Sequence, residues 1–406
     1  MHSDDSQQLD RRKFLGTSLG LAAGATWLSS CGKEGAEGAG ADAATGPVLP
    51  DGLSEDDFLV HGASPWTMET KRSALHGLIT PTDKVFVRGN LPFPDGAILE
   101  DRDAWTLAIE GVARPGSVSL ADLKGMGRAT VCSVLQCSGN GRLFYEHGPS
   151  GSPWGVGAAA NVLWTGVPLR TVLEAFGGPV DGMEFLTGTG GEPLPDGLDP
   201  RTIIVERSVP LAKAMADGLL AWDMNSEPIT MSHGGPLRLV IPGYYGVNNV
   251  KYLERLAPTA AETDAKIQVS SYRVRPIGQK GAADQPSMWA MNTKSWITAP
   301  LGGTPLAAGR RQVTGVAFSG EAPIEGVEVT TDGGVTWQNA ELVGPDLGPY
   351  AWRQFSHTWQ AEPGQHLIAS RARDTRGMQQ PENRLENERG YAHNGWRDPA
   401  VTVQVV

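Results

Sequence analysis

A cysteine at the junction of an apolar segment and a glycine-rich loop is the residue best suited to chemistry in this chain. Residues 131–142 are Val-Cys-Ser-Val-Leu-Gln-Cys-Ser-Gly-Asn-Gly-Arg, and Cys137 stands where the apolar part ends. A cysteine thiolate is a polarisable ligand for a soft metal. Gly139 and Gly141 allow a tight turn or the close approach of a ligand. The segment predicts a metal-binding thiolate, and a buried structural cysteine beside an ordinary loop is the alternative interpretation.

The elements that must position Cys137 are short. Apolar residues predict a buried strand over 131–135, so Cys137 would follow its carboxyl end. Cys132 lies five positions earlier, and this odd spacing on a strand points the two side chains to opposite faces, so we expect Cys132 in the core. The neighbouring sequence predicts strands over 85–88, 105–111 and 236–243, and helices over 120–124 and 168–176. Because these elements lack regular strand–helix–strand spacing, the fold class is an α+β mixed sheet.

The pattern changes after residue 280. Short alternating apolar runs follow one another, and turn signals at Asp332-Gly-Gly and Pro363-Gly separate some of them. This spacing is typical of an all-β, immunoglobulin-like sandwich. The runs cover 311–318, 326–330, 367–372 and 401–406. We therefore expect a catalytic domain over 55–275 and an immunoglobulin-like domain over 280–406.

Charge and cysteine content exclude several classes of protein. The 406 residues carry a formal net charge of −11 and show no basic stripe, which argues against nucleic acid as a partner. The chain has 3 cysteines, too few for a zinc-binding quartet, and they do not form a disulfide framework. No C-x-x-C-H haem attachment motif occurs, so we expect no haem and an electron acceptor outside this chain.

The amino terminus predicts export. Arg11 and Arg12 form a twin-arginine pattern, and the apolar, Gly/Ala-rich run that follows is too short for a stable membrane span. Leu-Ser-Ser-Cys over 28–31 is typical of a lipobox, which predicts lipid attachment at Cys31; ordinary peptidase cleavage without a lipid is the alternative. We expect a signal over 1–30, a flexible tether over 31–54 and a periplasmic location, with membrane contact only through the lipid.

Several segments then resemble one family in its own order. Residues 135–140, Leu-Gln-Cys-Ser-Gly-Asn, resemble the molybdenum-ligating segment of the sulfite oxidase family. Phe-Val-Arg over 86–88, followed by Leu-Pro, is similar to its first cofactor loop. Val-Pro-Leu-Ala-Lys over 209–213, Ser-His-Gly-Gly-Pro-Leu-Arg over 232–238 and Val-Lys over 250–251 are similar to its later cofactor segments.

The resemblance implies a molybdopterin cofactor, with Cys137 as the protein ligand of molybdenum. Residues implied to bind the cofactor are Phe86, Val87, Arg88, Asn90, Cys137, Asp199, His233, Arg238, Asn249, Val250 and Lys251, with Asp196 as a competitor of Asp199. Residues implied to surround the substrate are Arg88, Arg142, Arg389, Trp154 and Tyr272. The residue types alone also allow surface ion pairs for Arg142 and Arg389, packing for Tyr272 and a turn role for His233.

The resemblance further implies oxidation of sulfite to sulfate by oxygen-atom transfer, with electrons passed to an external c-type cytochrome. It also implies a homodimer formed through the sandwich. A sulfane dehydrogenase of the same family, which acts on carrier-bound sulfur, is one alternative. A metal-free lipoprotein that only binds anions is another. A sulfoxide reductase is disfavoured because that branch of the family lacks the terminal sandwich.

Overall fold

The computed structural model describes residues 48–406. The twin-arginine segment, Cys31 and most of the predicted tether lie outside these residues. Leu49 is buried, and Asp51 accepts a hydrogen bond from the N–H of Ser232 at 2.9 Å. The last residues of the predicted tether therefore pack on the folded chain. Within residues 48–406, no helix is both long enough and apolar enough to cross a membrane.

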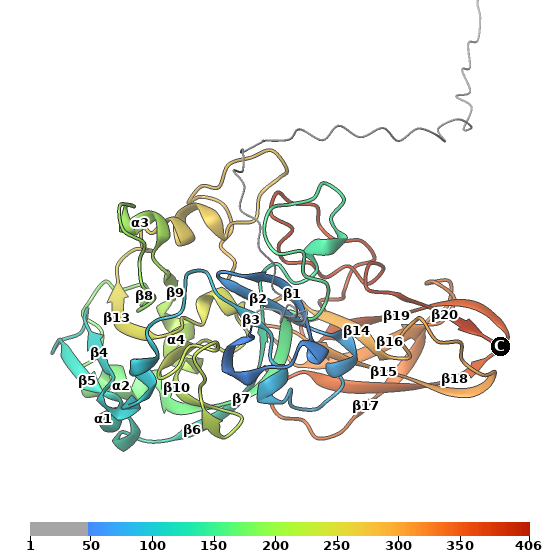
Figure 1. The fold of residues 1–406 in the computed structure, drawn as a ribbon, viewed down its shortest axis with the longest axis horizontal. Helices are drawn as coiled ribbons and strands as arrows, with labels where there is room; N and C mark the ends of the chain where they lie inside the picture. The colour runs from blue at the N-terminus through green and yellow to red at the C-terminus, as the bar shows by residue number, and fades with distance from the viewer. Residues whose placement is uncertain (1–47) are drawn as a thin grey trace, which may run out of the picture. The chain divides into compact units, whose positions relative to one another are not determined.

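Three sheets build the first part of the folded chain (Figure 1). The smallest pairs β1 (Phe58–Ala63), β2 (Trp66–Thr70) and β3 (Val87–Arg88) in antiparallel order. The second has the order β11 (Glu227–Pro228), β10 (Leu219–Met224), β7 (Ala159–Pro168) and β6 (Ala129–Gln136), with β12 (Arg238–Val240) also paired to β10. The third has the order β5 (Gly116–Ser119), β4 (Thr106–Ile109), β13 (Leu253–Thr259), β8 (Phe185–Gly190) and β9 (Glu206–Pro210). It is mixed, because β13 is parallel to β4 and antiparallel to β8.

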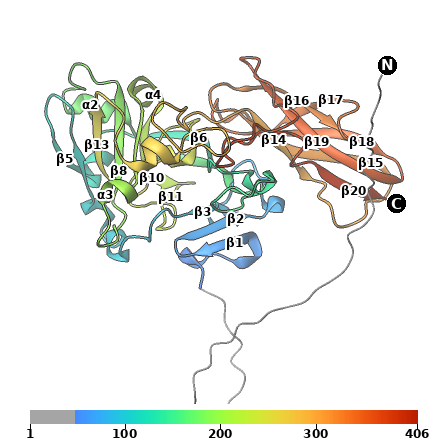
Figure 2. The same cartoon turned by 90° about the horizontal axis from the view of Figure 1, so that it is seen from above.

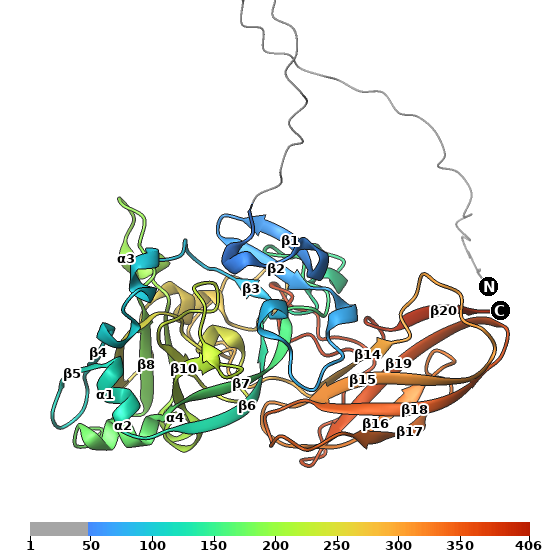
Figure 3. The same cartoon turned by 60° about the horizontal axis from the view of Figure 1, so that its bottom comes forward.

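Short helices connect strands of the second and third sheets. They are α1 (Leu120–Gly125), α2 (Leu169–Ala175), α3 (Pro200–Ile203) and α4 (Leu211–Asp217). Leu123 of α1 and Val172 of α2 are fully buried in one cluster with Leu107 and Leu186 of the sheet (Figure 3). The hydroxyl of Ser119 accepts a hydrogen bond from the N–H of Asp122, and this bond caps the first turn of α1. Burial of one apolar face thus stabilises α1 and α2, whereas α3 has no buried residue.

The last seven strands form the sandwich. Their order is β14 (Lys294–Ala299), β15 (Gly309–Phe318), β18 (Arg353–Ala361), β17 (Gln338–Val343), β16 (Ile324–Thr330), β19 (Gly364–Asp374) and β20 (Val401–Val405). All these neighbours are antiparallel, and Ile297, Val313 and Phe355 contribute to an apolar core between the strands. The hydroxyls of Ser295 and Ser370 lie 2.9 Å apart, so β14 also meets β19. The α+β class followed by an all-β sandwich is confirmed.

The strand that leads to Cys137 is buried on both faces. Val134 packs in one cluster with Trp296 of the sandwich, and Leu135 packs on the other face in a cluster with Trp164. This explains the nearly continuous apolar composition of β6. The N–H of Val134 also donates to the carbonyl of Tyr350 at 2.8 Å, and β6 and β7 extend toward the sandwich strands (Figures 2 and 3).

Two predicted strands are shorter in the structure. The strand predicted over 236–243 is limited to β12, because Pro236 and Pro242 flank it and proline has no N–H for a ladder. The strand predicted over 85–88 is limited to β3, since only Val87 and Arg88 pair with β2 before the chain turns at Gly89. Both short strands end at the wall of a cavity.

Candidate active site

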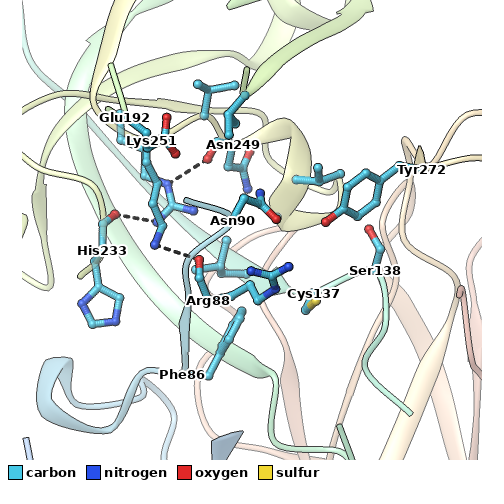
Figure 4. A pocket seen from close by; sticks show the side chains of 16 residues that line it. Phe86, Arg88, Asn90, Cys137, Ser138, Glu192, His233, Asn249, Lys251 and Tyr272 are labelled. Carbon is cyan, nitrogen blue, oxygen red and sulfur yellow. Dashed lines mark hydrogen bonds between the residues drawn. The ribbon is translucent and has the colours of Figure 1, made fainter. Parts of the chain in front are cut away.

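A cavity lies where the ends of several strands meet (Figure 4). Its wall comes from β3, from the residues just after β6 and β8, from β12, from the approach to β13, and from the end of a π-helical turn, η9 (Ile267–Ser271). The fold therefore gathers distant parts of the chain at one place. The lining residues are Phe86, Arg88, Asn90, Leu135, Cys137, Ser138, Glu192, Val205, His233, Arg238, Gly246, Val247, Asn249, Val250, Lys251 and Tyr272.

Cys137 stands at the end of β6. Its N–H donates to the carbonyl of Ala158 at 2.9 Å, which continues the pairing with β7 by one residue. The thiol is partly exposed and lies on the cavity wall. Cys132 is buried within β6, and burial raises the pKa of its thiol to about 12. As predicted, Cys132 belongs to the core, and Cys137 is the cysteine available to a ligand in the cavity.

The loop after Cys137 requires its two glycines for steric reasons. A side chain at Gly139 would overlap the guanidinium of Arg142, and one at Gly141 would overlap the ring of His393. Gly141 also has a φ of +104°, a left-handed conformation that favours glycine. The tight packing of the loop against its neighbours, rather than flexibility, explains the Gly-x-Gly pattern.

The backbone of this loop is held by the C-terminal half of the chain. The carbonyl of Ser138 accepts from the N–H of Ala392 at 3.0 Å, and the carbonyl of Asn140 accepts from Nζ of Lys294 at 3.0 Å. The carbonyl of Cys137 accepts from the N–H of Asn140 at 3.0 Å, which closes the turn. Lys294 is 1 % exposed, and burial lowers the pKa of its ammonium group to about 7. The sandwich therefore helps to fix the position of the cavity thiol.

Two cations, the buried Arg238 and the half-buried Lys251, lie on another part of the wall. Arg238 donates from Nε to the carbonyl of Asn249 at 3.1 Å and from Nη1 to the carbonyl of His233 at 2.8 Å. Burial lowers the pKa of Arg238 to about 10. Lys251 donates to the carbonyls of Arg88 at 3.0 Å and Ser232 at 2.5 Å. Burial, followed by the charge of Arg238, lowers the pKa of Lys251, so an anion bound here would be strongly favoured.

His233 acts through its backbone in this structure. Its carbonyl accepts from Arg238, whereas its ring nitrogens lie 3.2 Å from the carbonyl of Val85 and 2.9 Å from the hydroxyl of Thr230. The ring points away from Lys251 in Figure 4. Burial lowers the pKa of His233 to about 4, so the ring is neutral near pH 7. These contacts favour a structural role for the imidazole, although a direct cofactor contact stays a prediction.

The carboxylate of the cavity is Glu192, which the sequence analysis missed. Glu192 follows Gly190, the last residue of β8, and Gly191, and its Oε2 is buried without a hydrogen-bond partner among residues 48–406. Burial raises the pKa of this carboxyl, and the charges of Lys251 and Arg238 oppose the rise. The two predicted aspartates, Asp196 and Asp199, are exposed and do not line the cavity. The carboxylate of Asp199 instead caps α3, because it accepts a hydrogen bond from the N–H of Arg201 at 2.9 Å. The Gly-Gly pair before Glu192 was the available signal, but it does not show that the glutamate is buried.

Tyr272 lies on the wall with two close neighbours. Tyr391 stacks on its ring with centroids 5.3 Å apart and planes at 8°. The guanidinium carbon of Arg207 lies 5.8 Å from the Tyr272 centroid, and Arg207 is fully buried. Burial lowers the pKa of Arg207 to about 10. Stacking and cation–π contact therefore restrict the orientation of Tyr272.

Arg142 and Arg389 are not among the residues that line this cavity, and their place around the substrate stays a prediction. Their guanidinium carbons lie 5.3 Å and 5.8 Å from the centroid of Tyr391, respectively. Nε of Arg142 donates to the carbonyl of Arg389 at 2.9 Å. Tyr391 therefore lies beside both guanidinium groups and stacks on Tyr272 of the wall.

Trp154 and Val87 are also absent from the wall. Trp154 has no exposed surface and packs edge-on behind Phe86, with ring centroids 6.3 Å apart. Successive side chains alternate in an extended chain, so Phe86 and Arg88 face the cavity while Val87 is buried with Met68 on the other face. Both residues support the wall from behind.

Comparisons with known proteins cover most of the described chain. Residues 93–267 match the family described as "Oxidoreductase molybdopterin binding domain", and residues 285–404 match "Mo-co oxidoreductase dimerisation domain". Sulfite oxidase from Rattus norvegicus is 32% identical over 387 residues, which cover 89% of this chain and 68% of the rat protein. Sulfite oxidase from Gallus gallus is 30% identical, over 86% of this chain and 79% of the chicken protein. The solved sulfane dehydrogenase SoxCD from Paracoccus pantotrophus is 26% identical with a TM-score of 0.72, over 92% of this chain and 96% of that chain.

Proposed function

Because this chain belongs to the sulfite oxidase family of molybdopterin oxidoreductases, we propose that it oxidises sulfite to sulfate and passes the electrons to an external c-type cytochrome. One observation carries the proposal. Cys137 is partly exposed on the wall of a cavity that is also lined by the buried Arg238 and the half-buried Lys251. A soft metal ligand and an anion-binding region thus share one cavity.

The residues of the cavity fit a molybdenum–pterin group. Nη1 of Arg88, Oγ of Ser138 and Oε2 of Glu192 are buried and have no hydrogen-bond partner among residues 48–406. Buried polar atoms are normally paired, so a polar ligand would complete their hydrogen bonds. When bound, this group supplies the two-electron redox chemistry for oxygen-atom transfer.

The side chains have distinct tasks in this proposal. Cys137 provides the protein sulfur ligand. Arg238 and Lys251 neutralise an anionic part of the cofactor through charge-assisted hydrogen bonds. Arg88 directs its unpaired Nη1 toward anionic oxygen, and Tyr272 is held in orientation by its stacked neighbour. These fixed donors stabilise negative charge without reorganising during the reaction.

The test is replacement of Cys137 with serine in protein matured in a host that makes molybdopterin. We expect sulfite-dependent reduction of cytochrome c to fall by more than about 100-fold, because a hydroxyl is a poor ligand for a soft metal. Cys132→Ala is the matched control, and it should retain activity because Cys132 is buried in β6 away from the cavity. Normal turnover in Cys137→Ser would refute the proposal.

A sulfane dehydrogenase is the second candidate. The specific observation in its favour is the similarity to sulfane dehydrogenase SoxCD, which extends over 92% of this chain. Steady-state rates with free sulfite and with a sulfane sulfur carried on a protein thiol separate the two functions. A strong preference for the carrier-bound sulfur would show that this sulfur, and not sulfite, is the substrate. The metal-free anion-binding alternative is disfavoured, because residues 93–267 match a molybdopterin-binding family.

Assembly and location complete the proposal. The match of residues 285–404 to a dimerisation domain supports a homodimer, which light scattering on the purified protein tests. The twin-arginine pattern and Cys31 support export to the periplasm with a lipid on Cys31. Cell fractionation of the wild type and of Cys31→Ser tests both points: the variant should be periplasmic but released from the membrane.

A further inference from the structure

Ser138, directly after the cavity thiol, has an unused hydroxyl. The residue is 1 % exposed, and its Oγ has no hydrogen-bond partner among residues 48–406. It also lines the cavity with Cys137 and Tyr272. Figure 4 shows the hydroxyls of Ser138 and Tyr272 pointing toward the same part of the cavity, next to Cys137.

The backbone gives this hydroxyl a fixed position. The carbonyl of Ser138 accepts from the N–H of Ala392, and the N–H of Cys137 donates to the carbonyl of Ala158. Gly139, the next residue, packs directly against a guanidinium. Because the residues on both sides are held, the loop cannot turn the hydroxyl toward solvent without breaking these contacts.

Another buried serine of the same segment shows the usual arrangement. Ser133 lies in β6 with 2 % exposure, and its Oγ donates to the carbonyl of Val134 at 3.3 Å. A buried hydroxyl without a partner is unfavourable, so its partner is expected in whatever occupies the space that it faces. For Ser138, that space is the cavity beside the sulfur of Cys137.

The nearby donors define the chemistry of that partner. Nη1 of Arg88 is another buried donor of the wall without a partner among residues 48–406. A guanidinium N–H can only donate and a hydroxyl can also donate, so a ligand atom that satisfies both is an acceptor, and the charge of the guanidinium favours an anionic one. Ser138 is neutral, which suits it to hold such an atom at a set place without adding charge.

We propose that Ser138 is a further binding residue, whose hydroxyl donates a hydrogen bond to an anionic acceptor atom held beside the Cys137 sulfur. The proposal rests on the proposed function, because it takes the cavity to hold a molybdenum–pterin group and an oxyanion. The acceptor belongs either to the oxyanion or to the cofactor, and the two sources have different experimental consequences.

The experiment compares Ser138→Ala with Ser133→Ala, each purified with its cofactor. Both variants remove one buried hydroxyl, at positions five residues apart in the same segment, and alanine fits either site. Three quantities are measured: the KM for sulfite, the Kd for sulfate by titration calorimetry, and the molybdenum and pterin retained after prolonged dialysis. Loss of a hydrogen bond to a charged acceptor corresponds to a change of roughly tenfold or more in affinity.

A rise of roughly tenfold in KM and in the sulfate Kd for Ser138→Ala, with normal cofactor retention, assigns the acceptor to the oxyanion. Faster loss of molybdenum and pterin with an unchanged sulfate Kd assigns it to the cofactor. If Ser138→Ala matches Ser133→Ala in all three measurements, the proposal is overturned. A wild-type protein that retains the cofactor but does not oxidise sulfite would contradict the proposed substrate alone, since cofactor retention and sulfate binding still test Ser138.

Discussion

Replacing Lys294 with methionine should change how stability depends on pH. The ammonium group of Lys294 is buried and donates to the carbonyl of Asn140, and burial lowers its pKa from 10.5 to about 7. Asp398 opposes this shift, but its carboxylate is engaged by His393 and Arg384, each at 2.8 Å. As pH rises from 7 toward 10.5, the unfolded chain keeps the proton of this lysine while the folded chain loses it. Rising pH therefore favours the folded state.

The size of the effect follows from the shift. With a folded pKa near 7, one group adds about 2 kcal/mol to the free energy of unfolding between pH 7 and pH 9. Lys294→Met removes this contribution. The free energy of unfolding of the wild type minus that of the variant should therefore rise by about 2 kcal/mol between pH 7 and pH 9. The variant also leaves the carbonyl of Asn140 without its donor, which should loosen the loop that carries Cys137.

Urea unfolding of cofactor-free protein at pH 7, 8 and 9 measures the first effect, and hydrogen exchange of residues 131–145 measures the second. Lys213→Met is the matched control, because Lys213 pairs with Asp217 and Tyr350 away from the loop. The reasoning is refuted if the wild-type and Lys294→Met curves remain parallel from pH 7 to pH 9.

Three further outcomes follow from the site. Glu192→Ala should lower pterin retention severalfold because it changes the cavity wall, whereas Asp199→Ala should leave retention unchanged because Asp199 caps α3. Pterin fluorescence measures the retained cofactor. Equal losses in the two variants would contradict the placement of Glu192 in the cofactor site. Tyr391→Leu should lower kcat/KM roughly tenfold, equivalent to about 1.4 kcal/mol, because it removes the ring that stacks on Tyr272. Tyr391→Phe keeps the stacked ring and should keep most of the rate. Equal kcat/KM values for the two variants would contradict the positioning role of Tyr391. Gly141→Ala should lower the free energy of unfolding by about 2 kcal/mol in urea titrations, because the added methyl group would overlap His393. Gly125→Ala should be nearly neutral, because its methyl group would meet no atoms within 4 Å. Similar losses of stability in the two variants would contradict the steric argument.

The fold was predictable where short-range patterns decide it. The apolar run before Cys137 became β6, and the alternating runs of the C-terminal half became strands such as β15 and β19. The limits of β3 and β12 were not predictable from apolar content, because turns and flanking prolines end their pairing. Local composition thus indicated the elements, while partners across the sheet set their lengths.

The site was predictable where a motif contains the residue itself. Cys137, Arg238 and Lys251 reach one cavity as the resemblance implies. Glu192 was missed because nothing in its local sequence shows that the chain buries it beside two cations. The contacts of Arg142 with the ring of Tyr391 and with the carbonyl of Arg389 could not be predicted from local sequence, because Arg389 lies 247 positions after Arg142 in the chain.

The central claim is that the sulfur of Cys137 is a ligand of molybdenum. X-ray absorption at the molybdenum edge of the purified protein tests it directly, by comparing wild type with Cys137→Ser. The account predicts that the variant, where it retains the metal, has one sulfur neighbour fewer than the wild type. An identical sulfur shell in both proteins would contradict it.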